Sequence, residues 1–372
     1  MNPATQHRPG NAEPAVREDG SQAAQPLVVP FTRASERYGE PFVDTSQQID
    51  ASAHQLGPFD VPSYGYLRHL VVEVSTSGGS GGSAAAQADA PWSAISSIQL
   101  TDVNGAPIVG PLSGYDLFLI NKWGAYLPNS NPAADPYYSA VNGTTGHFAF
   151  MLRIPVEFVA RDALGALPNQ NAAQSYKLSL TLADETAIYS TSPATTLPVA
   201  RFRVSMECWA PPSETDKATG AVQATQPPAI GTTAYWSKYV GTVNASANTT
   251  RLPRVGNMIR NLILVKRDSS GDRADEFGDD LRVEWDAQTM FNRRLVTLQD
   301  QAYHAYGLAP DTGVLVLTNT TDFDGAAGDE MRDYYWQTGQ ATRLDLIYTA
   351  SAAGSIDVLT NDVAPAGDIF GR

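Results

Sequence analysis

Two short stretches decide the fold of this chain: Leu67-Arg68-His69-Leu70-Val71-Val72 and, much later, Ile259-Arg260-Asn261-Leu262-Ile263-Leu264. Each begins with an apolar residue followed by arginine, and each continues in the same phase of apolar positions. Leu70, Val72 and Val74 alternate with other residues, which is typical of a β-strand with one buried face. The pair predicts one strand that occurs twice.

Four further matches flank this pair and keep the same order along the chain. They pair residues 50–52 with 244–246, 98–102 with 282–286, 148–152 with 313–317, and 176–180 with 342–346. The match of 98–102 is weaker and needs a different offset. A single match between apolar strands carries little information, but five in one order indicate two copies of one β fold.

Each copy contains one short helical stretch at the same rank. In the first, Ser113 and Asp116 have the spacing of a capping box, and Gly124 lies near the end. Apolar residues of this helix are expected on one face: Tyr115, Phe118, Leu119, Trp123 and Tyr126. The second has Leu295, Leu298, Ala302 and Tyr306 at helical spacing, closed by Gly307 in the position of a C-cap.

Composition shifts divide the chain. The first residues of the chain are polar and contain several prolines, which predicts an unfolded arm. Later, Pro211-Pro212 and Pro227-Pro228 bracket a polar segment that is typical of a linker. The first copy is longer because of two predicted loop insertions, 75–91 and 129–145. The expected organisation is an N-terminal arm (1–25), a first domain with longer loops (26–209), a Pro-rich linker (210–231), a second domain (232–365) and a C-terminal tail (366–372).

Charge and cysteine content exclude several classes of protein. The formal net charge is −14, so long-range attraction to nucleic acid phosphates is not expected. The single cysteine, Cys208, cannot form a disulfide within the chain. We also expect no signal peptide and no membrane-spanning helix, since no apolar run approaches the necessary length.

Short alternating strands separated by turns predict an all-β chain of two tandem β-sandwiches, for which the jelly roll is one form. This duplication, the chain length and the N-terminal arm resemble the double jelly-roll major capsid proteins of tailless, internal-membrane-containing (tectivirus-like) bacteriophages. The prolines of residues 1–25 argue against the long N-terminal helix often found in that family.

The resemblance implies a viral major capsid protein and no enzyme. It implies homotrimers that form pseudo-hexagonal tiles of an icosahedral shell over an internal membrane. The implied partners are further copies of the chain, penton or vertex proteins, minor capsid proteins and, through the arm, the membrane. The implied location is the virion, assembled in the host cytoplasm, without cofactors or direct nucleic acid binding.

No catalytic, cofactor-binding or metal-binding residue is predicted. Gly78-Gly79-Ser80-Gly81-Gly82 satisfies GxSxG, but in a flexible tract that would not hold a nucleophile in place. The five histidines are His7, His54, His69, His147 and His304, without metal-ligand spacing. Two acidic groups lack calcium-loop spacing: Asp268, Asp272, Asp275, Glu276, Asp279 and Asp280, and Asp322, Asp324, Asp329 and Glu330.

Three side chains outside these motifs are candidates for structural or intersubunit contacts. Arg68 and Arg260 occupy equivalent positions in the repeat and read as ordinary strand-edge charges, with matching salt bridges or intersubunit contacts as the other interpretation. Phe370 either anchors the end of the chain on a neighbouring subunit or is frayed.

Two other functions remain open from the sequence. A tandem β-sandwich that binds or acts on carbohydrate would use Trp92, Trp123 and Trp236 to stack on sugars. A phage spike or minor vertex protein would share the β-rich composition without needing duplicated domains.

Overall fold

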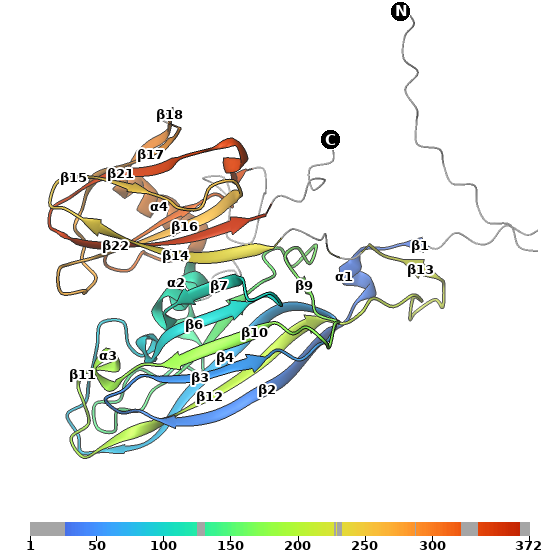
Figure 1. Cartoon of the computed structure of the whole chain (residues 1–372), viewed down its shortest axis with the longest axis horizontal. Coiled ribbons are helices and arrows are strands. Elements are labelled where there is room, and N and C mark those ends of the chain that lie inside the picture. The colour runs from blue at the N-terminus through green and yellow to red at the C-terminus, as the bar shows by residue number, and fades with distance from the viewer. Residues whose placement is uncertain are drawn as a thin grey trace, which may run out of the picture.

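A computed structural model describes residues 27–124, 131–226, 228, 233–286, 288–320 and 334–364, which form two stacked β-sandwiches (Figure 1). The expected arm over 1–25 and tail over 366–372, including Phe370, lie outside the described residues, as does Tyr126.

The first sandwich has two antiparallel sheets. One has the order β2-β12-β4-β8, and the other has the order β3-β10-β6-β7. Their bounds are β2 (Arg37–Gln48), β3 (His54–Asp60), β4 (Tyr66–Ser80), β6 (Ile95–Thr101), β7 (Pro107–Leu112), β8 (Ala149–Pro155), β10 (Lys177–Leu182) and β12 (Thr196–Trp209). The short β9 (Leu167–Pro168) pairs with the start of β4.

The second sandwich repeats this plan with the orders β14-β22-β16-β19 and β15-β21-β17-β18. Its strands are β14 (Ala234–Val243), β15 (Ala247–Arg251), β16 (Met258–Arg267), β17 (Phe277–Trp285), β18 (Gln288–Arg294), β19 (Val314–Thr318), β21 (Leu344–Ala350) and β22 (Gly354–Val363). The short β20 (Trp336–Gln337) pairs with β16.

Ranked along the chain, the eight main strands of each sandwich have the order 1-8-3-6 in one sheet and 2-7-4-5 in the other. Both sandwiches are therefore jelly rolls, which confirms the predicted fold class. The stretch 67–72 lies in β4 and the stretch 259–264 in β16, which are both third-ranked strands. The other sequence matches also fall on strands or turns of equal rank.

The two predicted helices are present between strands of ranks five and six. Helix α2 (Gly114–Trp123) has the capping box, since the Ser113 hydroxyl accepts from the Asp116 N–H and the Asp116 carboxylate accepts from the Ser113 N–H. Helix α4 (Leu295–Tyr306) ends at Gly307, whose φ of 66° lies in the left-handed region that glycine tolerates.

Two sequence expectations need correction. Residues 75–91 are not all loop, because β4 continues to Ser80 and β5 (Ala85–Ala86) pairs with β11 (Tyr189–Thr191). Strand pairing uses the backbone, so a Gly/Ser tract extends β4 once β12 supplies the partner.

The second correction concerns the linker, whose described residues do more than cross between two bodies. Within it, β13 (Gln223–Ala224) pairs in parallel with β1 (Leu27–Val28), and the Ser213 N–H donates to the Ala34 carbonyl. This two-stranded sheet is separate from the sheets of both sandwiches.

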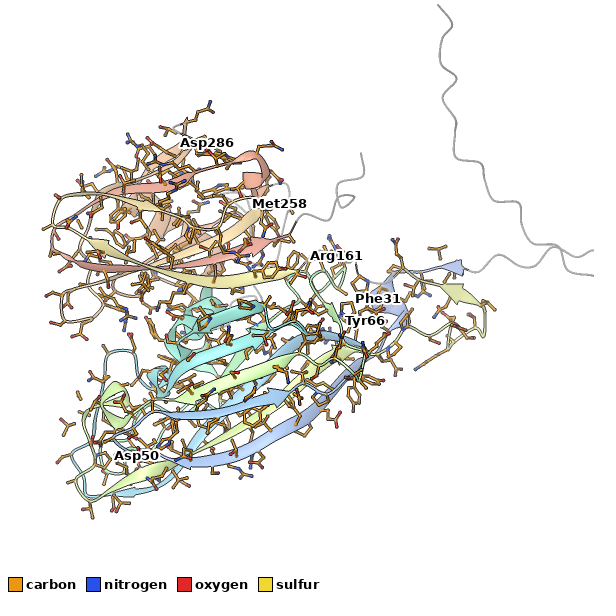
Figure 2. The ribbon with its side chains drawn as sticks, viewed as in Figure 1. Phe31, Asp50, Tyr66, Arg161, Met258 and Asp286 are labelled. Atoms are coloured by element: carbon orange, nitrogen blue, oxygen red, sulfur yellow. The ribbon has the colours of Figure 1, made fainter. Side chains whose placement is uncertain are left out.

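The connection between these short elements and the first sandwich is aromatic. Helix α1 (Phe31–Ala34) places Phe31 against Tyr66 and Trp209, with ring centroids 5.0 and 6.3 Å apart. Figure 2 shows Phe31 and Tyr66 at one end of the sandwich and Asp50, in the turn between β2 and β3, at the other. Both the described N-terminal segment and β13 are thus held at one end of the first sandwich.

We predict that Ser113→Ala lowers the free energy of unfolding by about 1 kcal/mol, because the Asp116 N–H loses its side-chain acceptor. Urea unfolding of the full chain measures the change. Ser77→Ala, at an exposed serine in β4, is the control and should change stability by less than about 0.5 kcal/mol. Equal effects of the two substitutions would contradict the role of the cap.

Candidate functional site

The junction between the two sandwiches combines strand pairing, apolar packing and ion pairs. Strand β7 of the first sandwich pairs in parallel with β14 of the second through Val109 and Trp236. This contact joins a sheet of each sandwich into one nine-stranded sheet. The relative placement of the two jelly rolls is therefore fixed by backbone pairing as well as by side chains.

Helix α2 fills the space beside this pairing, and every one of its residues is buried. The sequence led us to expect one buried face. The second face is covered because Ile263 and Val265 of β16 and Leu359 of β22 belong to the same apolar cluster as the first sandwich's core. The Trp123 ring meets Tyr306 of α4 edge to face, with centroids 5.3 Å apart.

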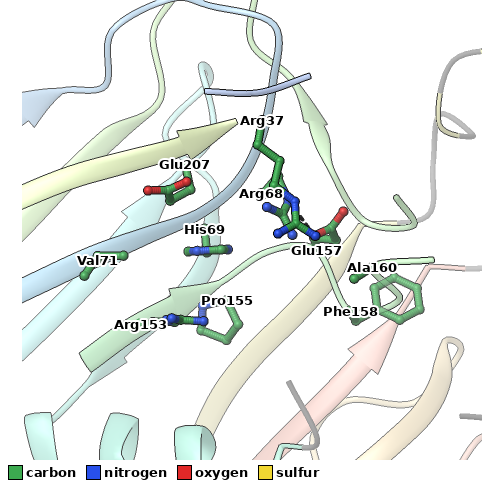
Figure 3. Close-up of a pocket in the computed structure, with 10 residues that line it drawn as sticks. All are labelled: Arg37, Arg68, His69, Val71, Arg153, Pro155, Glu157, Phe158, Ala160 and Glu207. Atoms are coloured by element: carbon green, nitrogen blue, oxygen red, sulfur yellow. Dashed lines mark hydrogen bonds and ion pairs between the residues drawn. The ribbon is translucent and has the colours of Figure 1, made fainter. Parts of the chain in front are cut away.

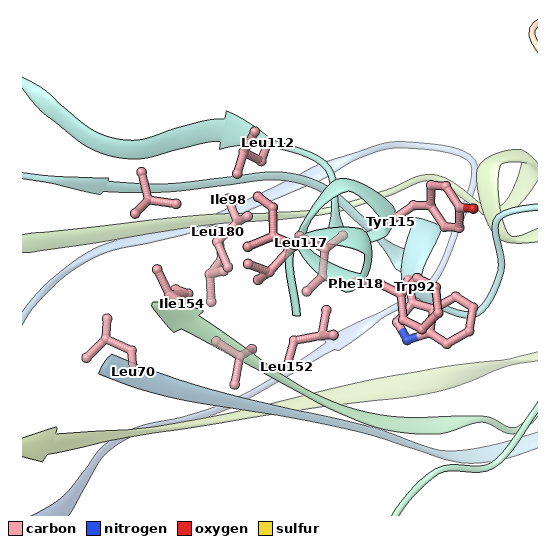
Figure 4. Close-up of a cluster of buried hydrophobic side chains, with 14 of the residues drawn as sticks. Leu70, Trp92, Ile98, Leu112, Tyr115, Leu117, Phe118, Leu152, Ile154 and Leu180 are labelled. Carbon is pink, nitrogen blue, oxygen red and sulfur yellow. The ribbon is translucent and has the colours of Figure 1, made fainter. Parts of the chain in front are cut away.

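On the side away from the second sandwich, α2 packs into the interior of the first. Figure 4 shows Leu117 and Phe118 among residues from both sheets, including Ile98, Leu152 and Leu180. Phe118 stacks on Trp92, with ring centroids 3.8 Å apart. The helix is thus a shared core element of both sandwiches.

A chain of six alternating charges runs along the junction. The Lys238 ammonium lies 2.9 Å from Asp116 and 3.1 Å from Asp357. Arg267 continues the chain, at 2.9 Å from Asp357 and 2.8 Å from Asp89. Arg273 completes it, at 2.7 Å from Asp89.

These charges come from both sandwiches, since Asp89 and Asp116 belong to the first and the other four to the second. Burial lowers the pKa of Lys238, but Asp116 and Asp357 outweigh burial and the net pKa is raised. A separate pair, Lys122 of α2 and Asp311, adds a contact of 2.9 Å across the same boundary. The alternation of signs compensates each buried charge and fixes the orientation of the two bodies.

Arg260 contributes a further link. It is fully buried in β16, and its Nη1 donates to the Gly124 carbonyl oxygen at 2.8 Å and to Asn361 Oδ1 at 3.1 Å. Gly124 is the C-cap of α2, where a helix favours positive charge. The guanidinium also lies 5.9 Å from the centroid of the Phe158 ring.

The interpretation of Arg68 and Arg260 as ordinary strand-edge charges is therefore wrong. Arg68 is buried too, and its Nε donates to Glu157 Oε2 at 2.7 Å. Trp209 Nε1 donates to the other carboxylate oxygen of Glu157 at 2.6 Å, and the Arg68 guanidinium lies 4.6 Å from the centroid of the Trp209 ring. The alternation of apolar residues along a strand does not reveal that Glu157 and Trp209 contact Arg68.

A cavity of about 430 Å³ lies near this second cluster (Figure 3). Its lining comes mainly from β2, β4, β8 and β12 and the segment after β8: Arg37, Arg68, His69, Val71, Arg153, Pro155, Glu157, Phe158, Ala160 and Glu207. Burial lowers the pKa of His69 to about 3, and the charges of Arg153, Arg68 and Arg37 act in the same direction. The imidazole is therefore neutral at physiological pH. Sequence reasoning singled out His69 and Arg68 but not the cavity, because its walls come from strands far apart in the chain.

The motifs weighed for chemistry do not assemble into a catalytic or metal site within the described residues. His147 contacts the Gly78 carbonyl oxygen, not the Ser80 hydroxyl of the GxSxG tract. His69 lies in β4 and His304 in α4, as expected. Burial raises the pKa of the Cys208 thiol to about 12.

Several carboxylate oxygens of the first acidic loop already accept hydrogen bonds or form ion pairs with neighbouring groups of the protein. Asp268 accepts from the Ser270 and Asp272 N–H groups, Asp275 accepts from the Gly313 N–H, and Glu276 pairs with Lys266 at 2.7 Å. The second group, Asp322, Asp324, Asp329 and Glu330, lies outside the described residues. In the part of the chain that is described, no three His, Cys, Asp or Glu side chains are grouped to hold a metal ion. Nor does any described helix have the length and apolar character needed to cross a membrane.

No sequence profile of a known protein family matches this chain, and no curated protein matches it by sequence. Solved structures do match its fold. The major capsid protein of Sulfolobus turreted icosahedral virus aligns with a TM-score of 0.65 and 13% identity over 91% of this chain and 99% of that one. The PBCV-1 virus capsid structure gives a TM-score of 0.63 and 12% identity over 89% and 94%. The major capsid protein P2 of bacteriophage PM2 gives 0.52 and 10% over 88% and 97%.

These alignments extend over nearly the whole length of each chain, so they include both sandwiches and the junction. The chain has the double jelly-roll fold of viral major capsid proteins. The predicted resemblance is confirmed at the level of fold, with a bacteriophage capsid protein among the matching structures.

We predict that Arg260→Met lowers the free energy of unfolding by about 2–4 kcal/mol, because the Gly124 carbonyl and Asn361 lose a buried donor. Hydrogen exchange should rise at the C-terminal end of α2. Arg251→Met, at an exposed arginine in β15, is the matched control and should change stability by less than about 0.5 kcal/mol. Unchanged exchange in α2 would contradict a role at the junction.

The low pKa of His69 makes stability depend on pH. Between its ordinary value of 6.5 and about 3, the unfolded chain binds a proton at this residue and the folded chain does not, so stability falls as pH falls through this range. His69→Gln removes this contribution, so its stability relative to wild type should improve by about 2 kcal/mol from pH 6.5 to pH 5. Urea unfolding at both pH values measures the difference. Parallel pH profiles of the two proteins would contradict the assignment.

Proposed function

We propose that this chain is a viral major capsid protein whose function is self-association into a shell, without catalysis. The observation that carries the proposal is the pair of jelly rolls locked into one body, which aligns over nearly its full length with major capsid proteins of three different viruses. A shell protein needs rigid, repeatable shape, and the junction supplies rigidity between its two halves.

The finer proposal concerns assembly. Three copies of a two-sandwich chain around a threefold axis present six similar sandwiches, which gives a pseudo-hexagonal tile. Such homotrimers would pack into an icosahedral shell over an internal membrane, as in the tectivirus-like phages. Penton or vertex proteins and minor capsid proteins would complete the shell, and no direct contact with nucleic acid is included.

The proposed division of the chain gives each segment a task. Residues 26–209 and 232–365 form the two wall domains, joined by the linker 210–231. The arm 1–25 would contact neighbours or the membrane, and the tail 366–372 would contact a neighbour. The protein would assemble in the host cytoplasm and reside in the virion.

Neither alternative has comparable support. A carbohydrate-binding role would need exposed aromatic rings, whereas Trp92, Trp123 and Trp236 are all buried in the junction and core. A spike or minor vertex protein would not need a second copy of the sandwich.

The native mass of the purified full chain, measured by light scattering after size exclusion, tests the assembly proposal. We expect three times 39.8 kDa and pseudo-hexagonal particles in negative stain. In a second arm, deletion of residues 1–25 should leave folded protein with impaired shell formation. A stable monomer under all assembly conditions would contradict the trimer, and normal shells from the truncated chain would contradict the role of the arm.

A further inference from the structure

The cavity beside Glu157 is a basic site on a strongly acidic chain. Three arginines line it in a protein of net charge −14. Arg68 is neutralised by Glu157 at 2.7 Å, and the neighbouring His69 is neutral. Glu207 also lines the cavity, so three arginines face two carboxylates and the lining keeps one net positive charge, with Arg37 and Arg153 outside any close ion pair in the described part of the chain.

Arg153 has a fixed backbone, and its side chain has no close carboxylate partner among the described residues. Its backbone is fixed by α2, since Asn121 Oδ1 accepts from the Arg153 N–H and Asn121 Nδ2 donates to the Arg153 carbonyl, both at 2.7 Å. Among the described residues, no acidic oxygen lies within 4.0 Å of its guanidinium; Glu207 acts on it only at longer range. Arg153 is partly buried, and this burial lowers its pKa. An anion paired with the guanidinium would offset that cost, so the position favours an acidic ligand.

Arg37 adds a second cation at the rim. It is exposed, and its guanidinium lies 5.7 Å from the centroid of the Trp209 ring without a carboxylate partner among the described residues. Phe158, Pro155 and Val71 supply the apolar side chains of the lining (Figure 3). The combination suits a carboxylate flanked by apolar side chains better than a bare inorganic ion.

The chain itself carries such a sequence, and it begins beside the cavity. Val363, near the end of β22, lies in the same buried cluster as Phe158, and the Ala364 N–H donates to the Thr233 carbonyl at 3.1 Å. Asp368-Ile369-Phe370 follows four residues later. Four extended residues reach at most about 14 Å.

We propose that this cavity is a carboxylate-binding site whose occupant is the segment Asp368-Ile369-Phe370 of the same chain. The Asp368 carboxylate pairs with Arg153 and Arg37, and the two apolar side chains contact the wall formed by Phe158, Pro155 and Val71. The site gives the end of this chain a specific receptor, and it holds whether or not the protein forms a capsid.

A binding measurement tests the charge pairing. The probe is a fluorescent peptide of residues 364–372, and the receptor is the full chain carrying Asp368→Asn, which weakens competition by its own segment. We expect saturable binding in fluorescence anisotropy, at least tenfold weaker when the peptide itself carries Asn at 368. Arg153→Met in the receptor should weaken binding by at least tenfold, and Arg37→Met about threefold, with higher salt reducing the affinity of the parent receptor.

The matched control in the receptor is Arg251→Met, which removes an exposed arginine from the second sandwich and should change affinity less than twofold. If Arg153→Met prevents folding, the exposed Arg37→Met variant and the Asn peptide decide the outcome. Equal binding of the Asp and Asn peptides, or unchanged binding to Arg37→Met and Arg153→Met, overturns the proposal. If the receptor binds sulfate but does not bind the peptide, the proposal is overturned too.

A cross-link identifies the copy that supplies the segment. The full chain has a single, buried cysteine, so Ala160→Cys and Phe370→Cys introduce one reactive pair at the cavity and in the segment. A disulfide within one chain places the segment in its own cavity and supports the site. A disulfide-linked dimer alone, or absence of the product within one chain under oxidising conditions with both thiols shown to be reactive, contradicts it. Because these experiments do not require shells, their failure is distinct from failure of the capsid proposal.

Discussion

The sheet β14-β22-β16-β19 buries apolar side chains on both of its faces, and the rest of the structure depends on this constraint. In β16, Ile259, Leu262 and Leu264 fill the core of the second sandwich, while Ile263 and Val265 join the core of the first. Leaving even one such aliphatic side chain in water costs about 1.5–3 kcal/mol. The second jelly roll therefore needs the first beside it, and the two sandwiches form one body.

Apolar burial drives this association but does not orient it, because the hydrophobic effect is not directional. Orientation comes from polar groups at the same boundary. Asp116 is the clearest case, since its carboxylate completes the capping box of α2 and also pairs with Lys238 of the second sandwich. Arg260 acts at the other end of the same helix, on the Gly124 carbonyl. Both ends of α2 are thus tied to the neighbouring jelly roll.

Much of the fold could be predicted from local sequence signals. The features that could not be predicted depend on residues that are distant in the sequence. Ser113 with Asp116, and Gly307 at a left-handed position, mark helix ends because caps act within one turn. The burial of Arg260 depends instead on a helix from the other domain. The cavity around Arg153 could likewise not be predicted from the sequence, because four strands that are far apart in the chain contribute to its lining.

The placement of the chain ends relates this architecture to assembly. Figure 1 shows β1 and the end of β22 on the same side of the molecule. The cavity lined by Arg153 lies near the end of β22, since Phe158 of its lining belongs to the same buried cluster as Val363. The turn that contains Asp50 lies at the opposite end of the first sandwich. A body that concentrates its connecting segments and its basic cavity at one end presents different surfaces to its neighbours at each end. Under the proposed shell function, such a difference between the two ends would suit a closed wall, whose inner and outer surfaces differ.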